Sequence, residues 1–301
     1  MKEVYTMDDL ASRELLDAGC DKPARLAVIG YPIAHSASPS MHQAALDSYG
    51  IDCRYIRFEV PAGMVEQSFA RMRVLDFIGV NVTVPHKFDA MICCDVLDPL
   101  AQALGAVNTV RFGANETTGY NTDGPGFVAA IENDFGVKLA DLKVLIAGAG
   151  GGAGQAIATQ CVLSGVRHLV LANRTVEKIA ILGERLRSLG DGFRIDVMGL
   201  DNPQIVELSH ECDLIVNTSS LGLHPADPCV LPESCINARH LVYDTIYKPE
   251  VTALIALAKA KGCQTSNGFS MLLRQGALAF QHWFPNTAPL ELMDKALARR
   301  T

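Results

Sequence analysis

Short apolar runs that end at turn residues alternate with stretches of helical spacing in the first part of the chain. Strands are predicted at 26–30, 55–60 and 78–84, and helices around 40–49 and 63–74. The first strand ends at Gly, Tyr and Pro, which suits a buried strand that enters a loop. This alternation predicts a mixed or parallel sheet covered by helices.

A clearer α/β unit begins with the apolar residues 142–147, which a run of glycines follows. Repetition of strand, helix and strand is typical of a doubly wound parallel sheet. The further strands are predicted at 168–172, 212–217 and 241–244, and the helices at 155–163 and 175–189. A helical stretch from about 268 onward is expected to fold back on the first unit.

The chain of 301 residues is longer than the roughly 100–200 residues of a usual domain, so we expect two compact units. The expected divisions are an N-terminal extension at 1–24, a first domain at 25–124, a second at 125–265 and C-terminal helices at 266–301. Leu10, Leu15 and Leu16 lie among acidic residues in the extension. They indicate either an amphipathic helix packed on the body or a loose tail.

Charge and composition narrow the class of partner. The net charge is −7, 49% of the residues are hydrophobic and 20% are charged, without a block of Lys or Arg. A globular protein of this kind lacks the basic surface that binds nucleic acid or an anionic membrane, which favours a small-molecule partner. With neither a long apolar stretch nor the apolar core of a signal peptide, the chain is expected to be cytoplasmic.

The nine cysteines are scattered, without a C-x-x-C pair. We expect reduced thiols, which behave as small buried hydrophobic groups. Since no His or Cys cluster has the spacing of a zinc site, no metal is expected.

The glycine run lies between a predicted strand and a predicted helix and has the pattern G-x-G-x-x-A. Glycines let the backbone turn tightly and approach a pyrophosphate, while the helix N-terminus presents N–H groups. The alternative is a glycine turn that serves only helix–strand packing. The residues expected to contact a dinucleotide are Gly148, Ala149, Gly150, Gly151, Gly152 and Ala153.

The end of the next strand bears on the choice between NAD and NADP. An acidic residue there accepts a hydrogen bond from the ribose 2′-hydroxyl of NAD, but the chain reads Asn173-Arg174-Thr175 and has Lys178 one helical turn later. Two cations and a hydroxyl favour the 2′-phosphate of NADP, although Glu177 weakens their field. The alternative is an ordinary N-cap Thr175 among solvated charges.

Three polar clusters follow apolar runs in the first part of the chain, at 35–40, 81–87 and from 105–109 to 121–124. Taken singly, their members could be turn residues, helix caps or one face of an edge strand.

Together the clusters resemble the shikimate dehydrogenase family. Its motifs occur in the family's order and cover roughly residues 25–285. They are Gly-Tyr-Pro-Ile at 30–33 with the Ser pair, Asn-Val-Thr-Val-Pro-His-Lys at 81–87, Gly-Ala-Val-Asn-Thr at 105–109, Asn-Thr-Asp-Gly at 121–124, Gly-Ala-Gly-Gly at 148–151, Asn-Arg-Thr at 173–175, Tyr243-Asp244 through Tyr247-Lys248-Pro249, and Gly-Phe-Ser-Met-Leu-Leu-Arg-Gln-Gly at 268–276.

The resemblance implies a substrate domain and a Rossmann-like NADP domain separated by a cleft, and the reversible NADPH-dependent reduction of 3-dehydroshikimate to shikimate. The family's catalytic pair maps onto Lys87 and Asp123. An ammonium can stabilise the charge that develops on the ketone oxygen and deliver a proton, and the carboxylate would orient it. The proton could pass through Lys87 alone or through the coupled pair.

The remaining contacts follow from the same resemblance, residue by residue. Substrate contacts map onto Ser36, Ser38, Asn81, Thr83, Lys87, Asn108, Asp123, Tyr247 and Gln275. Further cofactor contacts map onto Thr218, Thr245, Gly268 and Met271.

Two positions depart from the family pattern. Thr245 stands where the family frequently has a Met beside the nicotinamide, and Lys178 stands where it has a second Arg. Because Lys lacks the planar guanidinium, we expect a reduced preference for NADP. We expect His86, next to the catalytic Lys, to be structural.

Three other functions stay open. They are a quinate/shikimate dehydrogenase that uses NAD, an aminoshikimate-processing relative, and a dinucleotide-sensing regulator without catalysis. We expect a monomer or a homodimer.

Overall fold

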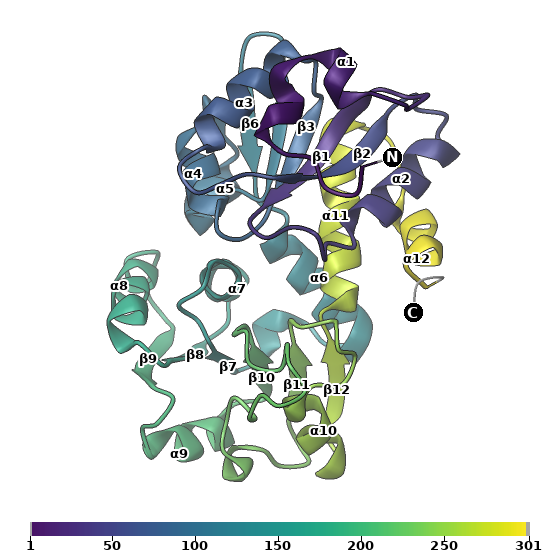
Figure 1. The fold of residues 1–301 in the computed structure, drawn as a ribbon. Coiled ribbons are helices and arrows are strands. Elements are labelled where there is room, and N and C mark those ends of the chain that lie inside the picture. The colour runs from purple at the N-terminus through teal and green to yellow at the C-terminus, as the bar shows by residue number, and fades with distance from the viewer. Residues whose placement is uncertain (1, 299–301) are drawn as a thin grey trace. The chain divides into compact units, whose positions relative to one another are not determined.

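The structure, a computed structural model, describes residues 2–298 and separates into two compact units. The first contains the chain up to Thr122 together with the residues from Leu273 onward, and the second is Asp123–Leu272. Each unit has a six-stranded sheet flanked by helices (Figure 1).

The sheet of the first unit is mixed, with the strand order β2-β1-β3-β5-β6-β4. Strand β5 pairs antiparallel with both β3 and β6, whereas the other pairs are parallel. The strands are β1 (Ala24–Gly30), β2 (Arg54–Glu59), β3 (Gly79–Val82), β4 (Val96–Leu97), β5 (Thr109–Phe112) and β6 (Thr117–Tyr120). The prediction of a sheet covered by helices is therefore confirmed in its mixed form.

Helices connect and flank these strands, and α2 packs beside α12. The helices are α2 (Ser38–Ser48), α3 (Val65–Val74), α4 (Lys87–Ile92), α5 (Pro99–Leu104), α11 (Phe269–Trp283) and α12 (Leu290–Ala298). Helix α11 begins in the second unit and continues into the first. Nε1 of Trp283, the last residue of α11, donates a hydrogen bond to the backbone oxygen of Val110 on β5 at 2.9 Å. This hydrogen bond joins the end of α11 to the first sheet.

The N-terminal segment belongs to the core of the first unit. Tyr5 forms a bridge to Phe58 beside the edge strand β2, and two short helices follow, a 3-10 helix at Met7–Ala11 and α1 at Arg13–Leu16. The packed alternative is confirmed, although as two short helices rather than one amphipathic helix, since Leu10 and Leu16 are buried while Leu15 is 56% exposed.

The sheet of the second unit is entirely parallel, with the order β12-β11-β10-β7-β8-β9. This is the strand order of the Rossmann fold. The chain adds β8 and β9 on one side of β7 and then β10, β11 and β12 on the other, and such sheets bind ligands at this switch point between β7 and β10. The strands are β7 (Val144–Ala147), β8 (His168–Asn173), β9 (Arg194–Gly199), β10 (Leu214–Asn217), β11 (Leu241–Asp244) and β12 (Gln264–Asn267). The predicted doubly wound sheet is confirmed.

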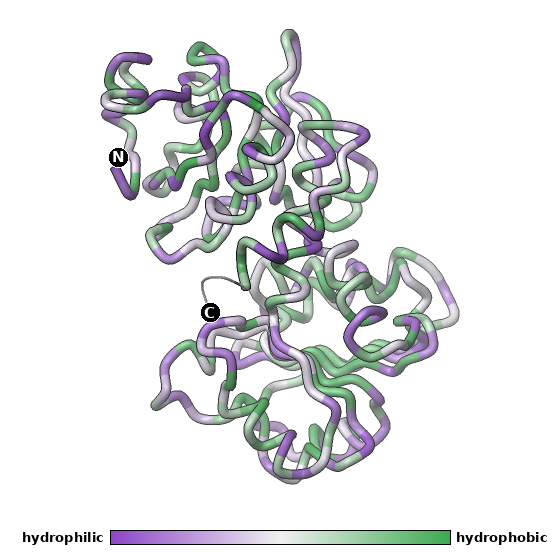
Figure 2. The backbone as a smooth tube through the Cα atoms, turned by 90° about the vertical axis from the view of Figure 1, so that its right-hand side faces the viewer, coloured by the Kyte–Doolittle hydropathy of each residue, from purple (hydrophilic) through white to green (hydrophobic). Residues whose placement is uncertain are grey.

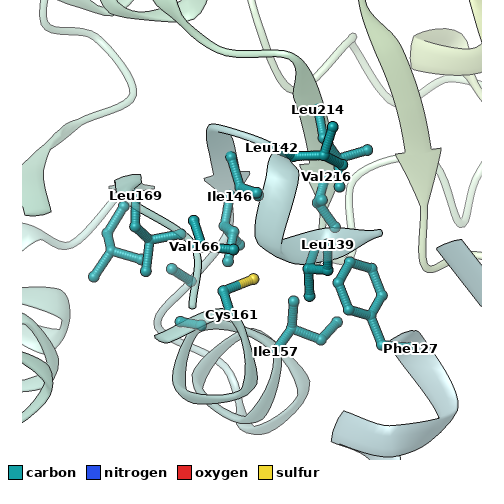
Figure 3. Close-up of a cluster of buried hydrophobic side chains, with 14 of the residues drawn as sticks. Phe127, Leu139, Leu142, Ile146, Ile157, Cys161, Val166, Leu169, Leu214 and Val216 are labelled. Atoms are coloured by element: carbon teal, nitrogen blue, oxygen red, sulfur yellow. The ribbon is translucent and has the colours of Figure 1, made fainter. Parts of the chain in front are cut away.

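The central strands of this sheet are hydrophobic along their length, as their green colour in Figure 2 shows. Their side chains are covered on both faces, which is why β7 and β10 are continuous apolar runs. Figure 3 shows Ile146 and Val216 of these strands facing Ile157 and Phe127 from the helices. The helices are α6 (Asp123–Phe135), α7 (Gly152–Leu163), α8 (Val176–Arg187), α9 (Gln204–Glu211) and α10 (Ala253–Ala260).

Several elements differ from the sequence expectations. The strand predicted over 78–84 ends at Val82, because the chain then turns and the N–H of His86 donates to the oxygen of Thr83 at 3.0 Å. Strands β4, β5, β6, β9 and β12 were not predicted. All but β9 have four residues or fewer, and β9 and β12 are edge strands whose side chains are partly exposed.

All nine cysteines are free thiols, and four of them, Cys53, Cys161, Cys212 and Cys235, are buried. Burial raises the pKa of the Cys53 thiol to about 11, so it stays protonated and unreactive. None of the helices in residues 2–298 is long and apolar enough to cross a membrane.

Candidate active site

The glycine loop joins β7 to α7 in the second unit, and its shape depends on three glycines. Gly148 has a φ of +86°, and a Cβ there would lie 2.5 Å from the backbone nitrogen of Ser219. A Cβ on Gly150 would lie 2.8 Å from Nδ2 of Asn173, and one on Gly154 would lie 2.7 Å from Oγ1 of Thr218. The loop therefore packs directly on the ends of β8 and β10.

Gly151 has a different environment, because the nearest heavy atom to a Cβ there is 3.9 Å away. It is the N-cap of α7, and glycine has no side chain to cap the N–H groups of the first turn. An open helix N-terminus of this kind suits a phosphate group. The residues of the loop thus fit a dinucleotide pyrophosphate.

A cavity of about 680 Å³ opens along this edge of the second sheet. Eight of the predicted cofactor residues line it, namely Gly148, Gly150, Gly151, Asn173, Arg174, Thr175, Lys178 and Thr218. The separate sequence signals of the glycine loop and of the β8 end are therefore brought together in one cavity.

The charged end of the cavity lies where β8 meets α8. Arg174 and Lys178 are both exposed, and the side chain of Asn173 is held by a hydrogen bond from Nδ2 to the oxygen of Thr175 at 2.9 Å. Thr175 occupies the N-cap position of α8, but its side chain makes no capping hydrogen bond. Its hydroxyl is thus available to a ligand, which weakens the alternative of an ordinary cap.

The other predicted cofactor residues of the second unit lie outside this cavity lining. A Cβ on Gly268 would lie 2.0 Å from the backbone oxygen of Thr245, so these two segments are in close contact. Met271 is only 8% exposed and packs in the hydrophobic core of the unit, and Ala149 is likewise buried.

The cavity also contains residues that the sequence analysis missed. They are Leu200, Asp201, Ser219, Ser220, Leu221 and Val230. A usable signal existed for the two serines, because they follow β10 at the point where the strand order reverses. The signal for Asp201 was hidden, since β9 was not predicted.

The loop after β10 is held by a buried polar network. The Asp244 carboxylate accepts hydrogen bonds from Nδ2 of Asn217 at 3.0 Å and from Oγ1 of Thr252 at 2.6 Å. Oδ1 of Asn217 accepts one from the hydroxyl of Ser219 at 2.7 Å. Burial raises the pKa of Asp244, while these hydrogen bonds oppose the shift.

In the first unit, the predicted substrate residues Asn81 and Asn108 form one buried hydrogen-bond network. Nδ2 of Asn81 donates to the backbone oxygen of Asn108 at 3.3 Å, and Asn108 is only 2% exposed. Nδ2 of Asn108 donates to the hydroxyl of Thr122 at 2.9 Å and lies 3.5 Å from Oε1 of Gln275, 167 residues later. The fold therefore brings together three predicted residues from distant motifs.

Tyr55 fixes the orientation of the Asn81 amide, because its hydroxyl donates to Oδ1 of Asn81 at 2.6 Å. Burial raises the pKa of Tyr55 well above its usual range, so the hydroxyl remains a donor. Sequence reasoning missed this residue, since a tyrosine in a predicted strand looks like an ordinary core residue.

The serine loop precedes α2. The backbone N–H of Ser38 donates to Oγ of Ser36 at 3.3 Å, and Nε and Nη2 of Arg57 donate to the backbone oxygen of Ser36 at 3.0 and 2.8 Å. Thr83 follows β3, and its methyl group faces Gly30, where a Cβ would lie 2.7 Å from it.

Lys87 is half-buried and begins α4. Its backbone oxygen accepts a hydrogen bond from the N–H of Val107 at 3.0 Å, which joins the second and third polar clusters. His86 is fully buried, and its Nε2 lies 2.6 Å from the backbone oxygen of Val60. This hydrogen bond to the main chain is structural, in line with the expectation for His86.

Asp123 and Tyr247 belong to the second unit. Asp123 begins α6, directly after Thr122, and is 6% exposed, whereas Tyr247 is half-buried after β11. Within residues 2–298, no group of three or more His, Cys, Asp and Glu side chains is arranged to hold a metal ion.

Comparison with known proteins places these features in a family. Residues 28–110 match the model of the shikimate dehydrogenase substrate binding domain, and residues 268–298 match that of the shikimate 5′-dehydrogenase C-terminal domain. A protein from Symbiobacterium thermophilum named shikimate dehydrogenase (NADP(+)) is 37% identical over 278 residues, which are 90% of this chain and 92% of that protein. The chain belongs to the shikimate dehydrogenase family.

Two further members of the shikimate dehydrogenase family support this assignment. The one from Geobacillus kaustophilus, also named as NADP(+)-dependent, is 41% identical over 85% of this chain and 91% of its own length. The crystal structure of shikimate 5-dehydrogenase from Thermus thermophilus in complex with NADP(H) and shikimate has a TM-score of 0.81 and 35% identity, and the match covers 92% of this chain and all of that one.

Proposed function

We propose that this chain is an NADP-dependent shikimate dehydrogenase, which reversibly reduces 3-dehydroshikimate to shikimate on the route to chorismate and the aromatic amino acids. The observation that carries the proposal is the nucleotide cavity of a family member. Arg174 follows β8 there, Lys178 lies in the first turn of α8, and no acidic residue occupies 173–175. The first unit, which ends at Thr122 and resumes at Leu273, would bind the substrate, and the second unit, Asp123–Leu272, would bind NADP.

The substrate would be held by polar and charged side chains of the predicted site. Hydroxyl and amide groups suit a substrate with several hydroxyls and a carboxylate, because each can donate or accept a hydrogen bond. The proposed contacts are Ser36, Ser38, Asn81, Thr83, Lys87, Asn108, Asp123, Tyr247 and Gln275.

Asn81 is best suited to an indirect part of this task. Its Nδ2 donates to Asn108 and to the hydroxyl of Thr109 at 3.1 Å, and its Oδ1 accepts from Tyr55. With both amide hydrogens in use, the side chain has one free lone pair to offer a substrate.

The catalytic work is assigned to Lys87 and Asp123. Bound NADPH supplies the hydride. The Lys87 ammonium would stabilise the negative charge that develops on the carbonyl oxygen and deliver the proton, and the Asp123 carboxylate would accept a hydrogen bond from a substrate hydroxyl.

Arg174 is proposed to bind the 2′-phosphate of NADP, with Thr175 and Lys178 as partners. Replacement of Arg174 by Ala should lower NADP affinity about 10- to 150-fold, because a charge-assisted hydrogen bond contributes about 1.5–3 kcal/mol. NAD affinity should barely change. The measurement is kcat/KM with each cofactor, and equal losses for both would show that Arg174 does not distinguish them.

Initial rates with shikimate and quinate, each with NADP and NAD, test the function as a whole. We expect the highest kcat/KM for shikimate with NADP. A preference for quinate and NAD would replace the proposal with the quinate/shikimate alternative, and the absence of turnover with all four combinations would favour a regulator that only binds dinucleotide.

A further inference from the structure

The nucleotide cavity contains one acidic residue among its cations. Asp201 lines the same cavity as Arg174 and Lys178, and all three side chains are exposed. None of them forms a salt bridge within 4.0 Å to another described residue of the chain. The cavity therefore combines two basic side chains with one acidic side chain.

Pairing between β8 and β9 explains why these charges are neighbours. Gly199, the last residue of β9, pairs with Asn173, the last residue of β8, and the N–H of Leu200 donates to the oxygen of Asn173 at 3.3 Å. Arg174 is one residue beyond this pair and Asp201 is two residues beyond it. In a parallel sheet both strand ends lie at the same edge, which brings the two side chains to one side of the cavity.

The position of the carboxylate itself supports this arrangement. A Cβ on Gly199 would lie 2.4 Å from Oδ1 of Asp201, so the carboxylate folds back over the end of β9. Gly199 leaves room for it, since any larger residue at this position would have to displace it. The negative charge is thereby kept at the strand end rather than directed away from the sheet.

We propose that Asp201 is a specificity-determining residue that reduces the preference for NADP over NAD. Its negative charge opposes the 2′-phosphate that Arg174 and Lys178 attract, whereas the neutral 2′-hydroxyl of NAD is little affected. This inference rests on the proposed function, because it requires a dinucleotide with its adenosine end at β8. The affinity for the 2′-phosphate would then reflect attraction by two basic side chains and repulsion by one acidic side chain.

The test is the substitution Asp201→Asn, which keeps the size of the side chain and removes its charge. Dissociation constants for NADPH and NADH are measured by titration calorimetry at low ionic strength. NADPH should bind about two- to fivefold more tightly, the size expected of one charge interaction near a surface. NADH binding should change less than this, and the difference should shrink in high salt.

Glu177→Gln is the matched control. Glu177 is exposed and lies between Arg174 and Lys178 in the sequence, yet it does not line the cavity. Its substitution changes the net charge by the same amount and should shift the NADPH/NADH ratio less. An equal shift in both variants would overturn the inference, because the effect would then come from net charge alone.

Two other results would also overturn it. If Asp201→Asn weakens NADPH and NADH equally, the carboxylate binds a part of the nucleotide that both share. If neither constant changes, the charge has no influence on the cofactor. The proposed function is tested separately, because it is wrong if the wild-type protein shows no turnover of shikimate. The dissociation constants for NADPH and NADH would still test the role of Asp201.

Discussion

The two units use similar sheets in different ways. In the second unit, glycines bring the backbone of the loop after β7 onto the neighbouring strand ends, and the cavity is built largely from main chain and strand termini. In the first unit, the candidate site consists of side chains, such as Asn81 and Asn108, that bind each other through hydrogen bonds. One unit would recognise its ligand mainly by shape and backbone, the other by a network of amides and hydroxyls.

This difference has consequences for how each site responds to change. A backbone site tolerates little added volume, because a single Cβ meets backbone atoms that cannot move aside. A side-chain network tolerates volume better but depends on every donor and acceptor, because a buried polar group left without a partner costs about 1–3 kcal/mol. Substitutions chosen separately for each unit can test the comparison.

The largest expected effect separates chemistry from cofactor binding. Lys87→Ala should reduce kcat about 100-fold or more, the usual contribution of a positioned acid–base group. The dissociation constant of NADPH should stay near the wild-type value, since residues of the second unit line the nucleotide cavity. Steady-state rates and NADPH titration check this, and a variant that keeps more than about a tenth of kcat would exclude Lys87 as the catalytic acid.

A smaller effect is expected from glycines in the second unit. A Cβ on Gly154 would lie 2.8 Å from both Cα of Ala149 and the oxygen of Gly148, so Gly154→Ala should lower the free energy of unfolding by about 1–3 kcal/mol and weaken NADPH binding. Gly151→Ala is the control, because its Cβ has open space. It should cost less than about 1 kcal/mol, the usual N-cap difference, while its methyl group enters the cavity.

Denaturant unfolding and NADPH titration of both variants measure these effects. Equal losses of stability in Gly154→Ala and Gly151→Ala would contradict the close packing of the loop. Unchanged NADPH affinity in both would mean that the loop is only a packing turn, the alternative that the sequence left open.

The nucleotide unit was largely predictable because its signals are local. The apolar runs of β7 and β10 and the glycine pattern at 148–154 each lie within a few residues of sequence. Each of these signals can therefore be recognised without knowledge of the tertiary structure. The edge strands β9 and β12 were missed, since an edge strand is partly exposed and its polar residues resemble a loop. Missing β9 also meant missing Asp201.

The substrate unit was less accessible to local reasoning. Asn108 and Gln275 are in contact although 167 residues separate them in the sequence. Strands β5 and β6 form an antiparallel pair, but their sequences lack a clear alternation of hydrophobic and polar residues. Resemblance to a family supplied the residues of this site, whereas the hydrogen bonds among them and the contribution of Tyr55 required the fold. The N-terminal segment teaches the same lesson, since the contact between Tyr5 and β2 depends on tertiary structure.

The two units also bury histidine differently. His42, in the first unit, is fully buried, stacks on Tyr55 with ring centroids 4.4 Å apart, and has no hydrogen-bond partner at either ring nitrogen. Burial lowers its pKa to about 3. His240, in the second unit, is also buried, with a pKa lowered to about 4, but its Nδ1 accepts a hydrogen bond from the N–H of Asn237.

The last expected effect is a pH dependence of the first unit, which is small near pH 6 and grows as the pH falls. The folded His42 binds its proton more weakly than the unfolded one, whose pKa is about 6.5, so the stability that neutral His42 provides is complete above that value and is lost as the pH falls toward 3. The loss should approach about 1.4 kcal/mol per pH unit for this one group. His42→Phe keeps an aromatic ring against Tyr55 and should make the stability of the first unit less sensitive to acid.

Trp283 allows this measurement to report on the first unit, because it is the single tryptophan of the chain and its ring lies 5.4 Å from that of His42. Urea unfolding followed by tryptophan fluorescence at pH 7, 6 and 5 should show a shallower loss of stability in His42→Phe than in the wild type. His35→Gln, at an exposed position, should behave like the wild type. If the free energy of unfolding fell equally with pH in the wild type and in His42→Phe, protonation of His42 would not account for the acid sensitivity of this unit.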